Sequence, residues 1–190
     1  MLKIGVMGGS FDPIHYGHLS LASLAAFKFG LDLVAFVPTN FSLQKKPVAS
    51  PLDRCAMVSM AISNDSRFFL SKVDIERGGV TFAFDTLSDL LSQYFPCRLF
   101  FILGIDALLG IEKWKNWQDL FDMTKFIVSE RPGYTISLPK KIEEKVEIFS
   151  PPLLSISSTL IRKRVAKGEP IDYLTGPLVC SFIRERGLYR

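Results

Sequence analysis

Short runs of apolar residues recur along the chain, separated by longer segments in which apolar residues return every three or four positions. A short apolar run bounded by turn residues predicts a buried strand, and the wider spacing predicts a helix. The expected strands are Leu2 to Met7, Leu33 to Val37, Phe68 to Val73, Arg98 to Leu103 and Phe126 to Ser129. The expected helices between them are His18 to Phe29, Leu52 to Ile62 and Phe84 to Tyr94.

This alternation predicts an α/β fold, a single Rossmann-like doubly wound domain over residues 1–190 with a mainly parallel sheet. Ligands of such sheets gather outside the carboxyl ends of the strands. A helical C-terminal segment is expected from Ser158 to Arg190, with one helix, a break at Gly168-Glu169-Pro170 and a second helix around Pro177 to Arg186. Residues 40–51 and 131–141 are expected to be exposed loops.

The composition limits the size of the core, the charge of the ligands and the compartment that can be expected. With 190 residues, 48% of them hydrophobic, the chain can bury a sizeable core. A net charge of +4 favours anionic ligands and is too small to indicate a nucleic-acid coat. The N-terminus lacks the layout of a signal peptide and no apolar stretch reaches membrane-spanning length, so cytoplasm is the expected compartment, with no membrane partner.

Three cysteines, Cys55, Cys97 and Cys180, are odd in number and widely separated, with no CxxC pair and no nearby histidine cluster. This pattern predicts buried thiols in a reducing compartment, without a disulfide framework or a zinc site. The sequence is also compatible with a homo-oligomer.

A glycine-rich turn directly follows the first expected strand. Glycines at positions 8, 9 and 17 let the backbone approach a ligand closely, and the next helix presents free N–H groups at its positive end. The only two histidines, His15 and His18, lie where the turn enters that helix. Either feature alone is more often structural, but their joint placement predicts an anion site in which two imidazoles stabilise charge that develops on a polyphosphate.

A second candidate lies near the other end of the chain, in Ile156-Ser157-Ser158-Thr159-Leu160-Ile161-Arg162. Hydroxyls at an expected helix start and a guanidinium one turn later can converge on one anion. Taken alone, the same residues are equally compatible with an ordinary helix cap.

The run from Gly9 to His18 resembles the HxGH signature of the nucleotidylyltransferase superfamily, and Ile156 to Arg162 resembles its ISSTxIR motif. In that family the first motif binds the triphosphate of ATP and the second closes over the β- and γ-phosphates. The resemblance implies that catalysis rests on His15, His18, Lys45 and Arg162. It also implies Mg²⁺ held mainly by ATP, and an ATP site formed in this part by Gly8, Gly9, Ser10, Phe11, His15, His18, Ile156, Ser157, Ser158 and Arg162.

Further motifs resemble one branch, the bacterial nicotinate mononucleotide adenylyltransferases. They are Gly104-Ile105-Asp106 (GxD), Lys113-Trp114 (KW), Arg131-Pro132-Gly133 (RPG), Asp85-Thr86-Leu87 after Glu76-Arg77, and the ending Gly187-Leu188-Tyr189. The resemblance implies that Gly104, Asp106 and Arg131 bind ATP, and that Lys45, Thr86, Trp114 and Lys115 contact the acceptor, a pyridine mononucleotide. Three of these residues also have a purely structural interpretation. Asp106 could cap a helix, Trp114 could pack in the core, and Arg131 could be a solvated charge in a turn.

The departures from the branch pattern fall on the acceptor side. Gln44 stands at a histidine position, Thr81-Phe82-Ala83 replaces SYT, and Lys115 replaces a tyrosine. The expected reaction is AMP transfer from ATP to nicotinate mononucleotide, giving deamido-NAD and pyrophosphate. The alternatives are a sister transferase that uses another acceptor (nicotinamide mononucleotide or phosphopantetheine) or CTP, a nucleotide-binding sensor without catalysis, and a structural domain, which leaves the paired motifs unexplained.

Overall fold

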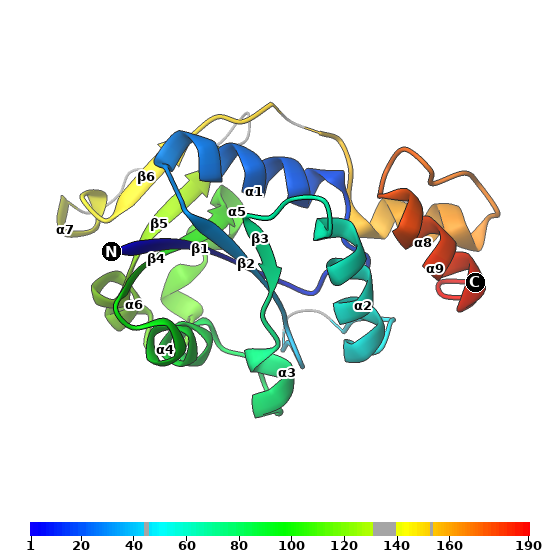
Figure 1. Cartoon of the computed structure of the whole chain (residues 1–190). Coiled ribbons are helices and arrows are strands. Elements are labelled where there is room, and N and C mark those ends of the chain that lie inside the picture. The colour runs from blue at the N-terminus through cyan, green and yellow to red at the C-terminus, as the bar shows by residue number, and fades with distance from the viewer. Residues whose placement is uncertain (44–45, 131–139, 153) are drawn as a thin grey trace.

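The computed structural model describes residues 1–43, 46–130, 140–152 and 154–190, with residues 140 and 141 described by their backbone alone. Within these residues, parallel strands form one sheet in the order β3-β2-β1-β4-β5-β6 (Figure 1). The strands are β1 (Leu2–Gly9), β2 (Leu33–Pro38), β3 (Phe68–Leu70), β4 (Cys97–Gly104), β5 (Thr124–Ser129) and β6 (Val146–Phe149). The expected parallel α/β fold is confirmed.

Helices cover both faces of this sheet. Figure 1 shows α1 along one face, α4 and α6 along the other, and α2, α8 and α9 gathered beside one another toward the C-terminus. The helices are α1 (Tyr16–Phe29), α2 (Pro51–Ile62), α3 (Val73–Arg77), α4 (Ala83–Tyr94), α5 (Ile105–Leu108), α6 (Trp117–Met123), α7 (Lys140–Glu143), α8 (Ser158–Ala166) and α9 (Pro177–Glu185), with a 3₁₀ turn η1 (Ile111–Lys113). None of the described helices is long and apolar enough to cross a membrane.

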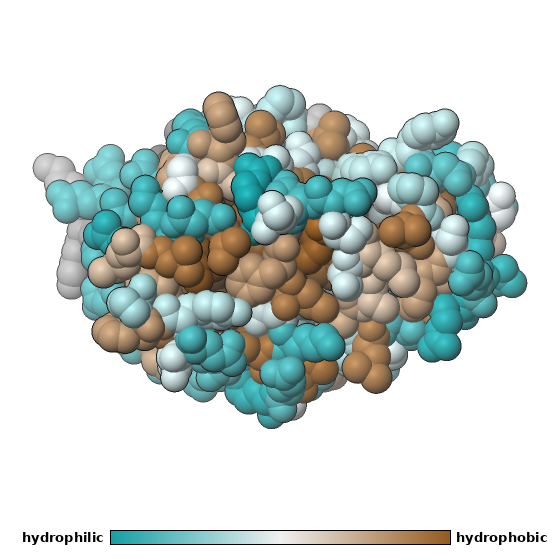
Figure 2. Space-filling view, viewed as in Figure 1, coloured by the Kyte–Doolittle hydropathy of each residue, from teal (hydrophilic) through white to brown (hydrophobic). Residues whose placement is uncertain are grey.

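The core consists of two apolar layers, one on each face of the sheet. Because successive side chains of a strand point to opposite faces, Ile4 and Val6 of β1 pack with α4 and α6, while Met7 packs with α1, α2 and α9. Gly5 allows close packing on that second face, since a Cβ there would come within 2.8 Å of Leu31 and 2.9 Å of Ile102. On the side drawn in Figure 2, hydrophobic residues gather across the middle and hydrophilic residues surround them.

One sequence-based expectation about strands was wrong. The strand expected over Phe68 to Val73 ends at Leu70, and Val73 begins the short helix α3, which ends at Arg77 and is followed by Gly78 with a positive φ of 73°. Asp74 is buried in that helix beside Arg77 and Thr86, which favours a helical turn over a longer edge strand. The edge strand β6 and the short elements α3, α5, η1, α6 and α7 were not expected, because their few residues carry too little periodicity.

The C-terminal segment follows the expected plan of helix, break and helix, as α8 and α9. The expected loop 131–141 lies mostly outside the described residues, and its last two positions begin α7. The strand order changes direction between β1 and β4, so the carboxyl ends of these two neighbours, at Gly9 and Gly104, flank the crevice where ligands of such folds bind.

Candidate active site

Two cavities open at the carboxyl edge of the sheet and share one wall. The larger, about 650 Å³, extends from the end of β1 toward α8, and the smaller, about 400 Å³, extends toward α4 and η1. The residues common to both linings are Gly8, Gly9 and Ser10. Any two ligands that fill these cavities therefore meet at the end of β1.

The two histidines lie at the first turn of α1, in the wall of the larger cavity. His15 is the N-cap residue of α1, and its ring stacks on that of His18 with 3.7 Å between centroids. The backbone N–H of His15 donates to Nδ1 of His18 over 3.3 Å. In neutral His18, an Nδ1 that accepts a hydrogen bond leaves the proton on Nε2, the form that can donate to an anion.

His15 is only 7% exposed, and burial lowers its pKa from 6.5 to about 4. It is therefore neutral at pH 7. Its Nδ1 atom is buried and has no hydrogen-bond partner among the described residues. His15 still lines the larger cavity, so its ring lies beside any ligand bound there. Gly17 leaves room for this ring, since a Cβ at position 17 would lie 3.0 Å from that nitrogen.

The start of α8 also lines the larger cavity. Ser157 caps the helix by accepting a hydrogen bond from the N–H of Leu160, at 3.1 Å. Ser158 Oγ donates to the carbonyl of Pro13 at 2.8 Å, and Arg162 donates to the carbonyl of Asp12 at 2.7 Å. The second motif thus contacts the cavity and also holds the backbone of the first motif.

Asp12 is the buried carboxylate of the larger cavity's wall. Its oxygens accept hydrogen bonds from the N–H groups of Val48 and Ala49 at 2.8 and 3.0 Å, and from the hydroxyl of Tyr189 at 2.8 Å. Burial and the neighbouring carboxylate raise the pKa of Tyr189, so the phenol stays protonated as a donor. Asp12 therefore links the β1 loop, the 46–49 loop and the end of the chain.

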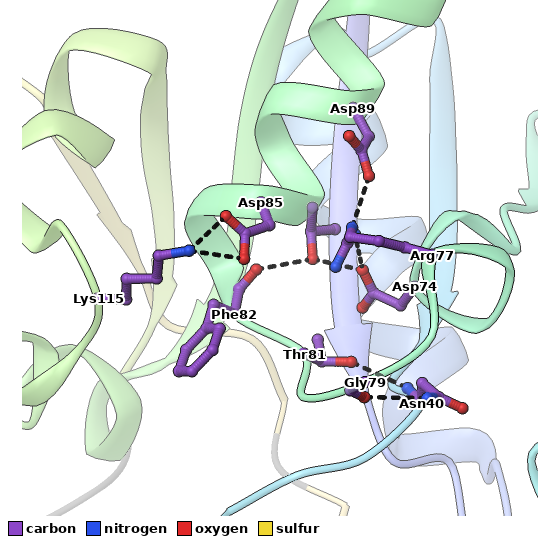
Figure 3. A network of polar contacts seen from close by, with 10 residues as sticks. Asn40, Asp74, Arg77, Gly79, Thr81, Phe82, Asp85, Asp89 and Lys115 are labelled. Carbon is purple, nitrogen blue, oxygen red and sulfur yellow. Dashed lines mark hydrogen bonds and ion pairs between the residues drawn. The ribbon is translucent and has the colours of Figure 1, made fainter.

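The smaller cavity has an aromatic wall formed by Phe82, Phe101 and Trp114. The rings of Phe101 and Trp114 meet edge to face with 6.1 Å between centroids. Figure 3 shows Lys115 reaching Asp85 beside Phe82: its ammonium lies 2.8 and 3.0 Å from the two carboxylate oxygens and 5.1 Å from the centroid of the phenyl ring. A flat aromatic ligand fits against such a wall.

A buried polar network borders the same cavity (Figure 3). Asp74 accepts a hydrogen bond from the Thr86 hydroxyl at 2.7 Å and from Arg77 at 2.6 Å, and Arg77 also donates to Asp89. Burial raises the pKa of Asp74, against the opposing effect of these two donors. The network fixes Thr86 at the cavity wall.

The structure gathers the expected site residues in two groups. The larger cavity is lined by Gly8, Gly9, Ser10, His15, His18, Ile156, Ser157, Ser158 and Arg162. The smaller cavity is lined by Thr86, Trp114 and Lys115, and also by Gly104, which was expected on the ATP side.

Other expected residues lie apart from both linings. Phe11 is buried behind the larger cavity, packed edge to face on His18. Asp106 is exposed in the first turn of α5 and is absent from both linings as far as the structure describes them. Lys45 and Arg131 lie outside the described residues.

Sequence reasoning missed three polar residues of this region. Lys46 lines the larger cavity, next in sequence to the expected Lys45. Asp12 lies within the first motif and was left without a role. The burial of Arg54 on the core face of α2 could not be inferred from the sequence, because a charged residue in a helical pattern is ordinarily solvated.

Comparison with known proteins agrees with this geometry. Residues 6–164 match the family model described as Cytidylyltransferase-like. The "Probable nicotinate-nucleotide adenylyltransferase" of Saccharopolyspora erythraea is 46% identical over 99% of this chain and 90% of its own length. A protein of the same name from Corynebacterium glutamicum is 42% identical over 99% of this chain and 88% of its own. The chain belongs to the nicotinate-nucleotide adenylyltransferase family.

A solved structure supports the same family assignment. The nicotinic acid mononucleotide adenylyltransferase of Plasmodium falciparum, complexed with NaAD, superposes with a TM-score of 0.82 at 25% identity, covering 100% of this chain and 98% of that one. The resemblance of the HxGH, ISSTxIR and GxD motifs to this family, stated from the sequence, is therefore confirmed at the level of the family.

Proposed function

We propose that this chain transfers the AMP part of ATP to nicotinate mononucleotide, giving deamido-NAD and releasing pyrophosphate. The observation that carries the proposal is the pair of cavities joined at Gly8, Gly9 and Ser10. The larger, with its histidines, Lys46 and Arg162, suits the triphosphate of ATP. The smaller, with Trp114 and Phe82, suits a pyridine ring.

The reaction requires no covalent intermediate. An oxygen of the acceptor's phosphate attacks the α-phosphorus of ATP in line, and the bond from that phosphorus to the oxygen bridging the β-phosphate breaks. The attacking phosphate is already ionised at neutral pH, so no general base is needed. Catalysis then comes from positioning the two ligands at the shared wall and from donors that meet the developing charge.

The contacts of three described residues support the roles that we propose for them in this reaction. His18, with its proton on Nε2, donates to phosphate oxygens at the start of α1, and neutral His15 supplies a second imidazole. Arg162, which also binds the Asp12 carbonyl, supplies positive charge for the β- and γ-phosphates. Lys45 and Arg131 keep their proposed roles as phosphate and nucleotide contacts, on the motif resemblance alone.

A magnesium ion fits this site as a companion of ATP. Asp12 is the carboxylate among the described residues of the larger cavity, and its oxygens are engaged by Val48, Ala49 and Tyr189. We therefore propose that the ion is held by triphosphate oxygens and water. When bound, it would neutralise charge on the phosphates. The charge of Arg162 and the Nε2–H donor of His18 then add to that effect.

The departures on the acceptor side leave a ring-binding wall in place. Phe82 lies in the lining where the branch pattern has a tyrosine, and Lys115 is paired with Asp85. The paired ammonium is therefore not a bare charge offered to the nicotinate carboxylate. The choice of the acid over the amide rests on the relatives' names and is part of the test.

The compartment and the number of domains stay predictions. Cys55 and Cys180 are buried as predicted, whereas Cys97 is only half-buried, and burial raises the pKa of all three thiols. The continuous sheet is compatible with one domain over residues 1–190.

The test is a pyrophosphate-release assay with ATP and Mg²⁺ and either nicotinate mononucleotide, nicotinamide mononucleotide or phosphopantetheine. We expect release with nicotinate mononucleotide and formation of deamido-NAD. The matched control is His18→Ala, for which turnover should fall on the order of 10²-fold or more with the fold intact. Release with phosphopantetheine alone, or with none of the three acceptors, would overturn the assignment.

A further inference from the structure

Arg54 is a charged residue with no exposed surface, on the second turn of α2. Burial lowers the pKa of its guanidinium, and the positive end of the helix dipole adds to the cost of a cation at this position. A buried charge persists in a fold when its surroundings satisfy it completely. The hydrogen bonds of Arg54 show which groups satisfy its buried charge.

The guanidinium donates to backbone carbonyls of three separate segments. One Nη donates to Ser10 at 2.7 Å, and the other donates to Thr39 at 2.7 Å and to Asn40 at 3.2 Å. Nε donates to Ala49 at 3.3 Å. These segments follow β1, follow β2 and precede α2. One planar group thus ties together the loops at the carboxyl edge of the sheet.

These loops form the walls of both cavities. Ser10 lies in the wall that the two cavities share, and Thr39 lines the smaller cavity. Ala49, through its N–H, also binds Asp12 of the larger cavity. Arg54 therefore lies behind the place where the attacking phosphate and the α-phosphate of ATP meet, and it touches neither.

The carboxylate of Asp12 balances the charge of Arg54. Its field raises the pKa of the guanidinium against the effect of burial. Asp12 accepts from the N–H groups of residues 48 and 49, while Arg54 donates to the carbonyls of Ser10 and Thr39. Asp12 therefore holds these loops through N–H groups, and Arg54 holds them through carbonyl groups.

On the basis of the proposed function, we infer that Arg54 is a positioning residue for adenylyl transfer: it sets the distance between the two ligands by fixing the Ser10, Thr39 and Ala49 backbones together. In-line attack depends steeply on the approach of the reacting atoms, and a misplacement of about 1 Å costs on the order of 10²-fold in rate. Arg54 acts on kcat through the loops and leaves the binding groups of each cavity in place.

The test compares Arg54→Lys and Arg54→Gln with the wild-type protein in the pyrophosphate-release assay. Lysine keeps the charge but offers its donors from one point, and glutamine keeps two donors without the charge, so neither spans three segments. We expect kcat to fall about 10- to 100-fold in both, with KM for ATP and for nicotinate mononucleotide changed less than about threefold. Assays are run well below each variant's unfolding temperature.

The matched control is Arg67→Lys. Arg67 is a partly buried arginine that holds a loop through Asp65 and Ser23, away from both cavities. We expect its kcat to stay at the wild-type value. Wild-type activity is measured in parallel, so failure of the proposed function is seen as a wild type without transfer, whereas failure of the inference is seen in the variants.

Three results would overturn the inference. The first is a wild-type kcat in Arg54→Lys, which would show that charge alone suffices. The second is a wild-type kcat with only a lower midpoint of denaturation, which would assign Arg54 to stability. The third is that neither variant folds even with deamido-NAD present, which would make Arg54 a residue of the fold and not of the reaction geometry.

Discussion

His15 and His18 stack at the start of α1, and their surroundings give them different chemistry. His15 is buried and neutral at pH 7, while His18 is oriented by a backbone N–H donated to its Nδ1. Two identical side chains three residues apart therefore differ in chemistry: His15 is a desolvated ring, and His18 is an oriented hydrogen-bond donor. Burial and hydrogen bonding, and not residue type, decide which is which.

The buried state of His15 predicts a pH-dependent stability. Its pKa is about 4 in the folded protein and 6.5 when unfolded, so the unfolded chain binds the proton more tightly. The stabilisation is present above pH 6.5 and is lost as the pH falls from 6.5 toward 4, by up to about 3 kcal/mol. Urea unfolding of the wild type and of His15→Gln at several pH values measures this difference.

The comparison removes the effect of other titrating groups, since both proteins share them. We expect the free energy of unfolding of the wild type to fall more steeply between pH 6.5 and 4 than that of His15→Gln. Parallel pH dependences of the two proteins would mean that His15 is not desolvated as the structure has it.

At the scale of elements, the first turns of α1 and α8 both line the larger cavity, and a hydrogen bond joins α8 to the loop before α1. Ser157 caps α8, and Ser158 donates to the loop that leads into α1. Each helix start therefore depends on the other for its position. Ser50 caps α2 in the same way, since its hydroxyl accepts a hydrogen bond from the N–H of Asp53. Unlike Ser157, Ser50 is not among the described residues that line the larger cavity.

This pair of caps separates a stability effect from a binding effect. Ser157→Ala and Ser50→Ala should each lower the free energy of unfolding by about 1 kcal/mol, the usual cost of a lost N-cap. Only Ser157→Ala should also raise KM for ATP, by about 3- to 10-fold, because a looser first turn presents its N–H groups less well. Chemical denaturation and steady-state kinetics of both variants measure the two effects.

Equal KM values for ATP in the two variants would contradict a role of the α8 cap in nucleotide binding. An equal loss of stability with an unequal KM is the expected outcome.

A helix start also contributes to the smaller cavity, where the first turn of α4 brings Asp85 to Lys115. There Lys115, which was expected to contact the acceptor, forms an ion pair with Asp85.

At the scale of the whole molecule, the C-terminal segment supports the first motif. Thr175 donates to the carbonyl of Ile14 at 2.8 Å, and the N–H of Tyr16 donates to the carbonyl of Leu174. Tyr189, 177 residues after Asp12, donates to its carboxylate. The end of the chain therefore stabilises a loop at its beginning, and α2 packs against α9 between them.

Removal of the Tyr189 hydroxyl tests this long-range support. Tyr189 is 8% exposed, and Tyr189→Phe leaves the buried Asp12 with one donor fewer. We expect the free energy of unfolding to fall by about 1.5–3 kcal/mol, the range for a hydrogen bond to a charged group. Tyr173→Phe is the matched control: at 92% exposure it should change stability by less than about 0.5 kcal/mol.

Thermal and urea unfolding of both variants give the comparison. A loss in Tyr189→Phe no greater than that in Tyr173→Phe would show that the backbone N–H groups of Val48 and Ala49 satisfy Asp12 by themselves.

Features that depend on neighbours along the chain could be predicted from the amino-acid sequence. The runs at Leu2 and Leu33 and the spacing of the main helices predicted a parallel α/β fold, because burial on a strand or helix imposes a period on nearby residues. The glycines before His15 and the hydroxyls before Arg162 predicted an anion site for the same reason: each motif is local. The short elements β6 and α3 were not predicted, because a segment of four or five residues is too short to show a clear periodicity of apolar positions.

Contacts between residues far apart in the chain could not be predicted from the sequence, and the three-dimensional fold shows them. It placed Gly104 in the smaller cavity, paired Lys115 with Asp85, and brought Tyr189 to Asp12. It also buried Arg54 behind the wall that joins the cavities. Such contacts follow from how helices pack on the sheet, and a hydrogen bond between segments far apart in the chain leaves no periodic mark in either one.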